Sequence, residues 1–181
     1  MEVPDQRLPA ATFEDLAMPL FDQLYNFAHW LTQDTAEAED LVQETYAKAL
    51  RGFPSFQLGT NFRAWMYRIL RNSFLSSRTG LKATVILDAE EQEDALPKET
   101  TTPESLLLEQ ANREMVQQAL GEVPAHHREI LLLFEVEEMS YQEISETLVI
   151  PIGTVMSRLS RARKALRSVL QQKLAGGRHG M

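Results

Sequence analysis

The segment Ser140–Leu166 decides the fold of this chain, and it reads SYQEISETLVIPIGTVMSRLSRARKAL. Apolar residues recur at helical spacing on both sides of Pro151, which predicts two short amphipathic helices joined by a tight turn. Ser140 and Glu143 form a candidate capping box for the first helix, and Thr154 is a candidate N-cap for the second. The second helix is basic on the side away from its apolar stripe. This layout is typical of a helix-turn-helix that reads double-stranded DNA; the alternative is an ordinary amphipathic helix with a solvated basic face.

Composition narrows the class of protein. The chain has 181 residues, a normal apolar content of 44% and no cysteine, so disulfides and thiolate metal sites are excluded. The start is polar, with Pro4 and Pro9, and does not resemble a signal peptide. No apolar run is long enough to span a bilayer. We therefore expect a cytoplasmic protein without membrane insertion, cofactor or metal.

Charge is distributed in blocks along the chain. The net charge is −8, yet residues 47–82 and 151–181 each carry seven Lys or Arg and no Asp or Glu. The acidic residues gather at 34–44, 88–109 and 135–146. Two basic surfaces separated by acidic segments indicate two nucleic-acid contacts on one chain, with other faces meeting something else. The alternative is that the blocks only keep the protein soluble.

Apolar periodicity predicts an all-α protein with two small helical domains joined by a flexible acidic linker. In the first domain (12–80), a helix broken near Pro19 is followed by one capped by Asp34 (about 36–51) and one capped by Asn61 (to about 78). The middle helix has an apolar stripe that includes Leu50. The second domain (104–174) has predicted helices at about 103–120, 124–136, 140–148 and 153–173. We expect disorder at 1–11 and 175–181 and a linker at 81–103.

Four motifs in this order resemble the extracytoplasmic-function (ECF, group IV) sigma factors of bacterial RNA polymerase. They are AEDLVQETY (38–46), NFRAWMYRILRN (61–72), SYQEI (140–144) and IGTVMSRLSRAR (152–163). The resemblance covers about residues 13–78 and 104–170. It implies a region 2 domain that binds core polymerase and the −10 promoter element, and a region 4 domain that binds the −35 element. The branch that answers thiol-oxidative stress is the most similar, and its members are typically restrained by a zinc-binding anti-sigma protein.

The resemblance also implies binding residues. It places the core-polymerase contact, on the β′ clamp, at Glu39, Asp40, Gln43 and Glu44. It places the −10 contact at Phe56, Gln57, Thr60, Asn61, Arg63, Arg68, Arg71 and Asn72. It places the −35 contact at Thr154, Ser157, Arg158, Ser160, Arg161, Arg163 and Lys164. The other partners it implies are the β flap and an anti-sigma factor.

The chemistry of these residues suits the implied roles. Strand opening needs a place for an extruded base and cations that hold the released strand: Phe56 can stack or wedge, or simply anchor its loop, and by resemblance Asn72 lines the base pocket. Ser157, Ser160 and Arg161 are the candidate base contacts, with Arg158, Arg163 and Lys164 on phosphates.

Some residues keep a simpler alternative. The acidic helix 37–46 and the side chains of Arg68 and Arg71 could merely be solvated, while Phe62 and Trp65 suit a core. Met156 stands where many family members carry Lys or Arg, so it either makes an apolar base contact or only packs.

The mechanism expected from these features joins two weak promoter contacts. In the free chain the two DNA-reading surfaces are not held at a fixed spacing, and core polymerase fixes them so that both elements are read together.

Three other classes of protein fit the sequence less well. A DNA-binding regulator with a C-terminal helix-turn-helix and no polymerase role explains residues 140–166 but leaves the basic, aromatic segment 53–78 unexplained. An enzyme is not expected, because no nucleophile motif or phosphate loop is present and the adjacent His126 and His127 point in different directions on a helix. A pure interaction module would leave both basic surfaces without a role.

Overall fold

The computed structural model describes residues 11–79 and 113–177. The predicted linker, most of the predicted N-terminal disorder and the last four residues lie outside the described ranges. We call residues 11–79 the N-terminal half and residues 113–177 the C-terminal half. All regular elements in both described ranges are helical, which confirms the predicted all-α class.

The N-terminal half is a bundle of helices whose ends follow from local sequence. Its elements are α1 (Phe13–Ala17), the 3-10 turn η1 (Met18–Leu20), α2 (Phe21–Thr32), α3 (Thr35–Gly52), the 3-10 turn η2 (Phe53–Ser55) and α4 (Phe62–Thr79). The break at Pro19 lies in η1, as expected for a residue that cannot donate a helical hydrogen bond. Asp34 caps α3, because its carboxylate accepts from the Glu37 amide at 2.8 Å. Asn61 caps α4 in the same way through the Ala64 amide at 3.0 Å.

The C-terminal half carries the helix-turn-helix. Its elements are α7 (Arg113–Glu122), α8 (Ala125–Leu131), the π-helical turn η3 (Leu132–Val136), α9 (Tyr141–Leu148) and α10 (Ile152–Gly177). Ser140 caps α9 by accepting from the Glu143 amide at 3.1 Å, as predicted. The turn between the two helices passes through Val149 at φ 56°, a left-handed conformation that is costly for a β-branched residue.

Three details of the elements differ from the sequence prediction. Helix α10 begins at Ile152, directly after Pro151, so Thr154 is not its N-cap; proline suits a helix start because the first amides need no helical acceptor. The helix also continues to Gly177 instead of ending near Lys173. Leu50 was assigned to the buried stripe of α3 but is 58% exposed, because the buried stripe runs through its neighbour Ala49 instead.

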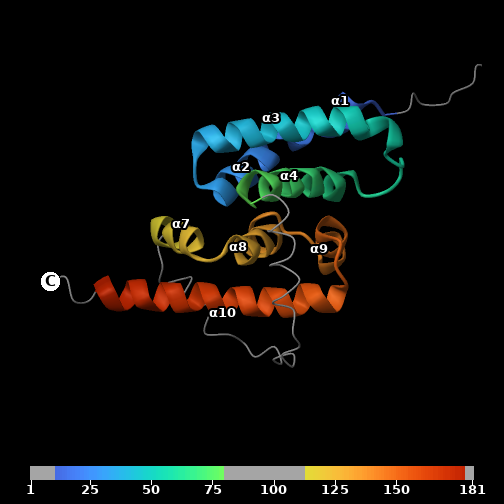
Figure 1. Cartoon of the computed structure of the whole chain (residues 1–181). Coiled ribbons are helices and arrows are strands. Elements are labelled where there is room, and N and C mark those ends of the chain that lie inside the picture. The colour runs from blue at the N-terminus through green and yellow to red at the C-terminus, as the bar shows by residue number, and fades with distance from the viewer. Residues whose placement is uncertain (1–10, 80–112, 178–181) are drawn as a thin grey trace, which may run out of the picture.

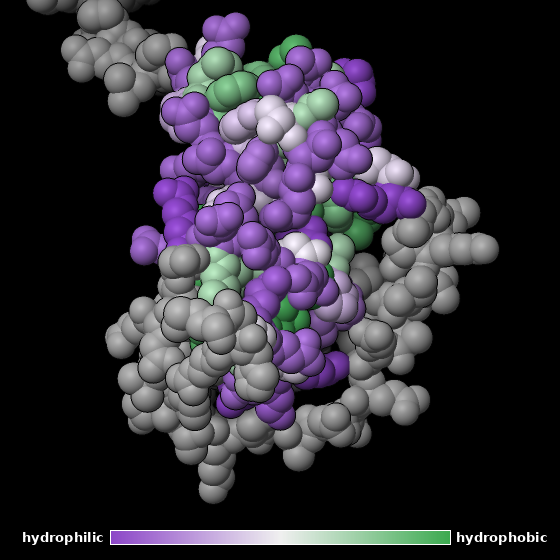
Figure 2. Space-filling view, turned by 90° about the vertical axis from the view of Figure 1, so that its left-hand side faces the viewer, coloured by the Kyte–Doolittle hydropathy of each residue, from purple (hydrophilic) through white to green (hydrophobic). Residues whose placement is uncertain are grey.

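The two halves pack on each other as two layers (Figure 1). Helix α4 lies against α9, and α2 lies against α8. The buried apolar residues of both halves belong to one continuous cluster. One face of the molecule is dominated by hydrophilic side chains, with only small apolar areas between them (Figure 2). The expectation that the two DNA-reading surfaces of the free chain are not held at a fixed spacing is therefore wrong for this arrangement.

Arg128 on α8 ties the halves together. Its guanidinium donates to the carbonyls of Leu31, at the C-terminal end of α2, and Leu120, at 2.5 and 2.6 Å. It also donates to the carbonyls of Gly121 and Val123. Burial, followed by the nearby charge of Arg78, lowers the pKa of Arg128. A buried cation is tolerated here because four carbonyls, three of them in the last turns of α2 and α7, replace its hydration.

No helix in the described ranges has the length and apolar character needed to cross a membrane.

We predict that Arg128→Ala destabilises the protein by about 3 kcal/mol, because it leaves buried carbonyls without a donor. Urea unfolding followed by circular dichroism measures the loss, with Arg51→Ala, an exposed residue of α3, as the control. A change of less than about 0.5 kcal/mol, the range of ordinary surface substitutions, would show that the hydrogen bonds of Arg128 contribute nothing to stability.

Candidate nucleic-acid interface

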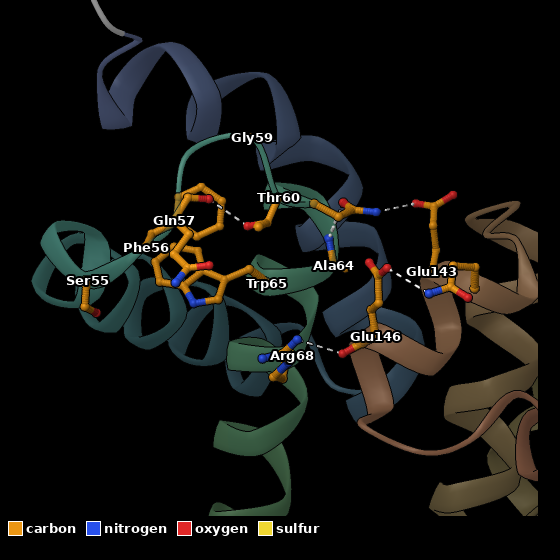
Figure 3. A pocket seen from close by; sticks show the side chains of 12 residues that line it. Ser55, Phe56, Gln57, Gly59, Thr60, Ala64, Trp65, Arg68, Glu143 and Glu146 are labelled. Carbon is orange, nitrogen blue, oxygen red and sulfur yellow. Dashed lines mark hydrogen bonds between the residues drawn. The ribbon is translucent and has the colours of Figure 1, made fainter.

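A groove of about 610 Å³ runs along the start of α4. Its lining brings together most of the predicted −10 residues with residues of α9. From the N-terminal half it is lined by Ser55, Phe56, Gln57, Gly59, Thr60, Asn61, Ala64, Trp65 and Arg68, and from α9 by Gln142, Glu143 and Glu146. Phe56 and Trp65 lie on one side of the groove, and Glu143 and Glu146 lie on the other (Figure 3).

The loop before α4 positions the polar groups of the groove. Thr60 donates its hydroxyl and its amide to the Gln57 carbonyl, at 2.7 and 3.2 Å. Gly59, at φ 92°, supplies the left-handed conformation that closes this turn. The side chain of Gln57 remains exposed at the loop surface. The loop therefore presents amide and hydroxyl groups at the entrance of a partly aromatic groove.

Phe56 is held in an aromatic cluster. Its ring lies 4.9 Å from the ring of Trp65, 5.2 Å from Phe62 and 6.1 Å from Phe53. Phe56 therefore anchors its loop, which was the alternative to base stacking, and its ring also lines the groove. Phe62 and Trp65 are half-buried in this cluster. The predicted role of Phe56 in stacking on a base remains a prediction.

Three of the four arginines of α4 have partners in the C-terminal half, while Arg78 pairs with Glu37 of α3. We call Arg63, Arg68 and Arg71 the α4 arginine face. Arg63 donates to the Glu137 carbonyl at 2.5 Å and lies 3.6 Å from the Glu143 carboxylate. The other two arginines each have a partner in this half as well: Arg68 donates to the Glu146 carbonyl at 2.8 Å. Arg71 pairs with Glu129 at 3.0 Å.

Tyr67 and Glu137 form the buried centre of this contact. The Tyr67 hydroxyl donates to the Glu137 carboxylate at 2.5 Å, and the Arg63 guanidinium lies 5.6 Å from the Tyr67 ring centre. Burial, followed by the Glu137 hydrogen bond, raises the pKa of Tyr67. Burial also raises the pKa of Glu137 against the opposing influence of Tyr67 and Arg63. The wide turn η3 and the left-handed residue Glu138, at φ 53°, lead the chain into and out of this position.

Arg71 and Glu129 form a second, more enclosed pair. Their side chains are 12% and 2% exposed, and both carboxylate oxygens accept from the Arg71 Nε, at 3.0 and 3.2 Å. Burial raises the pKa of Glu129, and the charge of Arg71 is the largest influence opposing it. Asn72, one residue further along, is exposed and lies on the same stripe of α4 as Arg68, one turn beyond it.

The predicted −35 residues lie along α10 with differing exposure. Lys164 is exposed, while Ser157, Ser160, Arg161 and Arg163 are partly exposed. The Arg161 guanidinium donates to the Ser157 hydroxyl at 3.4 Å, and Arg163 pairs with Glu135 at 3.5 Å.

One of the predicted −35 contacts on α10 needs correction. Arg158 was predicted to contact phosphate but is only 8% exposed, because it lies three residues after Val155 and four before Ala162 and so shares their buried stripe. Thr154 is partly exposed, like Ser157 and Ser160, so its predicted contact with the −35 element stays a prediction. Met156 is 39% exposed, which leaves the apolar base contact, rather than core packing, as its open role.

The four predicted polymerase-binding residues share an exposed surface of α3. Glu39, Asp40, Gln43 and Glu44 are all exposed, on the side opposite the buried Leu41 and Val42. Asp40 and Glu44 also line a shallow groove of about 390 Å³ between α3 and α4, together with Phe74 and Arg78. The surface is acidic and open to a basic partner.

Sequence reasoning missed the carboxylates that meet the α4 arginine face. Glu129 and Glu137 had been given no role and Glu143 only a capping role, although residues 135–146, which hold Glu137 and Glu143, were recognised as an acidic block. The signal was the complementarity of this block with the basic block at 47–82. In the described ranges, no group of three or more His, Asp or Glu residues could hold a metal ion.

Comparisons with known proteins match both halves to one family. Residues 16–83 match the family model described as sigma-70 region 2, and residues 113–166 match sigma-70, region 4. A regulator with only a helix-turn-helix would not account for the first match. The sigma factor RpoE of Bartonella quintana, solved in complex with the anti-sigma factor NepR, superposes with a TM-score of 0.64 at 30% identity, over 87% of this chain and 98% of that one.

Relatives of known name extend over most of the chain. The ECF RNA polymerase sigma factor SigW of Bacillus subtilis is 30% identical over 88% of this chain and 89% of its own length. The RNA polymerase sigma-H factor of Pseudomonas aeruginosa is 31% identical over 93% and 91%. The ECF factor SigE of Mycolicibacterium smegmatis is 34% identical, and the match spans 65% of that relative and 88% of this chain. With both regions matched in chain order and these relatives aligned along most of its length, this chain belongs to the ECF sigma factors of RNA polymerase.

Proposed function

We propose that this protein directs core RNA polymerase to promoters by reading the −10 element with α4 and its preceding loop and the −35 element with α10. The observation that carries the proposal is the presence of a cationic helix in each half, one in region 2 and one in region 4. Binding to core polymerase holds the two surfaces at one spacing, so that two weak contacts act as one strong contact.

The −10 surface combines the chemical groups that strand opening requires. Amide and hydroxyl groups of Gln57, Thr60 and Asn61 border the groove and can hydrogen-bond base edges. The aromatic side chains behind them offer a face on which an extruded base stacks. Arg63, Arg68 and Arg71 follow along the same helix and can hold the released strand through its phosphates. Asn72, one turn beyond Arg68, is proposed to meet the extruded base.

The −35 surface is proposed to read bases with Ser157, Ser160 and Arg161 and to hold phosphates with Arg163 and Lys164. The hydrogen bond from Arg161 to the Ser157 hydroxyl restricts the guanidinium to one side of α10. A guanidinium fixed in this way can bind guanine through two parallel hydrogen bonds in the major groove.

The exposed carboxylates at Glu39, Asp40 and Glu44, with Gln43, are proposed to dock on the β′ clamp, and the C-terminal half is proposed to meet the β flap. We also propose a cytoplasmic location, because the protein is proposed to act on RNA polymerase. We further propose control by an anti-sigma factor, supported by the 30% identical RpoE that was solved with NepR. The motifs at 39–46, 59–70 and 153–159 support the thiol-oxidative-stress branch, and with it a zinc-binding anti-sigma that would supply the thiols this chain lacks.

Run-off transcription with purified core polymerase on a random promoter library tests the proposal. We expect transcripts whose templates share two short conserved elements at a constant spacing. The control is core polymerase alone on the same library. If addition of the protein enriches no start site, the proposed function is wrong, whatever the protein binds on its own.

Arg161→Ala is expected to weaken binding at the −35 element by about 1–3 kcal/mol and to relax its sequence preference, because a bidentate base contact is lost. Lys164→Ala is the matched control: loss of a phosphate contact should weaken binding similarly for all sequences. Both variants are measured by transcription from single-base variants of the −35 element. An unchanged preference in Arg161→Ala would remove this residue from the reading set.

Asn72→Ala is expected to impair strand opening more than initial promoter binding, because it removes an amide proposed to meet the extruded base. Permanganate footprinting measures opening, and a mobility-shift assay on double-stranded promoter DNA measures binding of the holoenzyme. Ser76→Ala, an exposed position one turn further along α4, serves as the control. Normal thymine reactivity in Asn72→Ala would contradict the assignment.

A further inference from the structure

We propose that the contact between α4 and the C-terminal half is autoinhibitory: carboxylates and carbonyls of region 4 occupy the groups of region 2 that the −10 strand needs. The inference rests on the proposed assignment of α4 to the −10 element. It adds that the free protein excludes the strand by itself, before any anti-sigma factor binds.

Each polar group concerned has a partner from the opposite half. Asn61 donates to Glu143 at 3.4 Å, and Arg63 reaches both Glu137 and Glu143. The Glu146 carbonyl occupies Arg68, and the Glu129 carboxylate occupies Arg71. All the partners are oxygen atoms that accept hydrogen bonds, and those of Glu129, Glu137 and Glu143 include carboxylate oxygens. Carboxylate oxygens and phosphate oxygens accept the same charge-assisted hydrogen bonds from a guanidinium, so an arginine engaged with one is withheld from the other.

The groove itself repels a nucleic-acid strand in this arrangement. Glu143 and Glu146 form the wall opposite Phe56 and Trp65 (Figure 3). A strand that stacked a base on the aromatic side would bring its phosphates close to these carboxylates. Like charges a few ångströms apart repel strongly in a partly enclosed site. Strand binding therefore requires that α9 move away from α4.

The contact is built to be reversible. The Arg63 and Glu143 side chains are 27% and 28% exposed, and such partly solvated pairs contribute little net stability. The more enclosed carboxylates, Glu129 and Glu137, lose hydration on burial, as their raised pKa values indicate, and this cost offsets much of the attraction. A competitor that binds the arginines releases the carboxylates to water, and it can therefore separate α4 from the C-terminal half.

A reversible cross-link tests the proposal without altering any proposed DNA contact. Gln33, at the end of α2, meets Gly121, at the end of α7: a Cβ built at Gly121 lies 3.8 Å from the Gln33 Cγ, the place a cysteine sulfur would take. The chain has no cysteine of its own, so the double variant Gln33→Cys with Gly121→Cys forms one disulfide. The single variant Gln33→Cys is the control for oxidation.

The probe is a fluorescein-labelled single strand that carries the non-template −10 sequence of a promoter returned by the library. We expect the oxidised double variant to bind it at least about tenfold more weakly than the reduced protein, since only the open fraction binds. Reduction should restore binding and run-off transcription. Equal binding by both forms overturns the proposal, as does a failure to form the disulfide in folded protein. If the reduced protein neither binds the strand nor directs transcription, the proposed function has failed, although the cross-link yield still reports the closed contact.

Variants that remove the charge of the carboxylates test the proposal in the opposite direction, by weakening the closed contact. Glu137→Gln with Glu143→Gln keeps acceptors for Tyr67 and Arg63 but removes two charges, and should raise affinity for the strand severalfold. The matched control, Glu114→Gln with Glu138→Gln, changes the net charge equally at exposed positions. An equal gain in both pairs would mean that only overall charge matters, and would overturn the proposal. Thermal unfolding of each variant confirms that the fold is retained.

Discussion

The attraction between the basic face of α4 and the acidic face of α8, η3 and α9 determines how the two halves sit. Neither half could bury these groups alone: Glu137 is enclosed only because Tyr67 and Arg63 meet it, and Glu129 only because Arg71 does. The hydrogen bonds of Arg128 then tie the last turn of α2 to the last turn of α7. Apolar packing makes the halves adhere, but an apolar surface tolerates many orientations, whereas these directional hydrogen bonds select one.

The same physical property that closes the molecule also makes it suitable for DNA. A guanidinium has a fixed fork of donors and no acceptor, so it binds any planar or tetrahedral oxyanion that reaches it. The chain therefore cannot have an arginine surface that is free for phosphate yet indifferent to its own carboxylates. With 26 acidic and 18 basic residues, the carboxylates are in excess. Whether the arginines bind DNA phosphates or carboxylates of the C-terminal half depends on how enclosed the site is and on how many linked anions each ligand offers. A promoter strand offers many linked phosphates, while α9 and its neighbours offer a few separate carboxylates.

Local features of this fold could be predicted from sequence, and long-range ones could not. The capping side chains of Asp34, Asn61 and Ser140 act within three residues, so their patterns are complete in the sequence itself. The predictions that Leu50 is buried and that Arg158 is exposed were wrong. Helical spacing locates a buried stripe only to within one neighbouring residue, and the element packed against the helix decides which residue is covered. The pairing of α4 with α9 spans about 80 positions along the chain. Its charge complementarity was visible, but complementary blocks can equally meet a different molecule, and nothing in the sequence separates the two outcomes.

Electrostatic repulsion between this acidic protein and DNA favours specific over non-specific binding. At net charge −8 the free chain is driven away from duplex DNA as a whole, and in the closed arrangement its region 2 cations are also neutralised at close range. Non-specific binding, which depends almost entirely on phosphate neutralisation, is therefore weak in the free protein. In the proposed mechanism core polymerase changes both conditions together: it docks on the exposed carboxylates of α3, which neutralises part of the excess charge, and α9 moves away from the −10 surface. On this proposal promoter affinity appears only in the assembled enzyme, and the free protein leaves unoccupied the promoters that it cannot use.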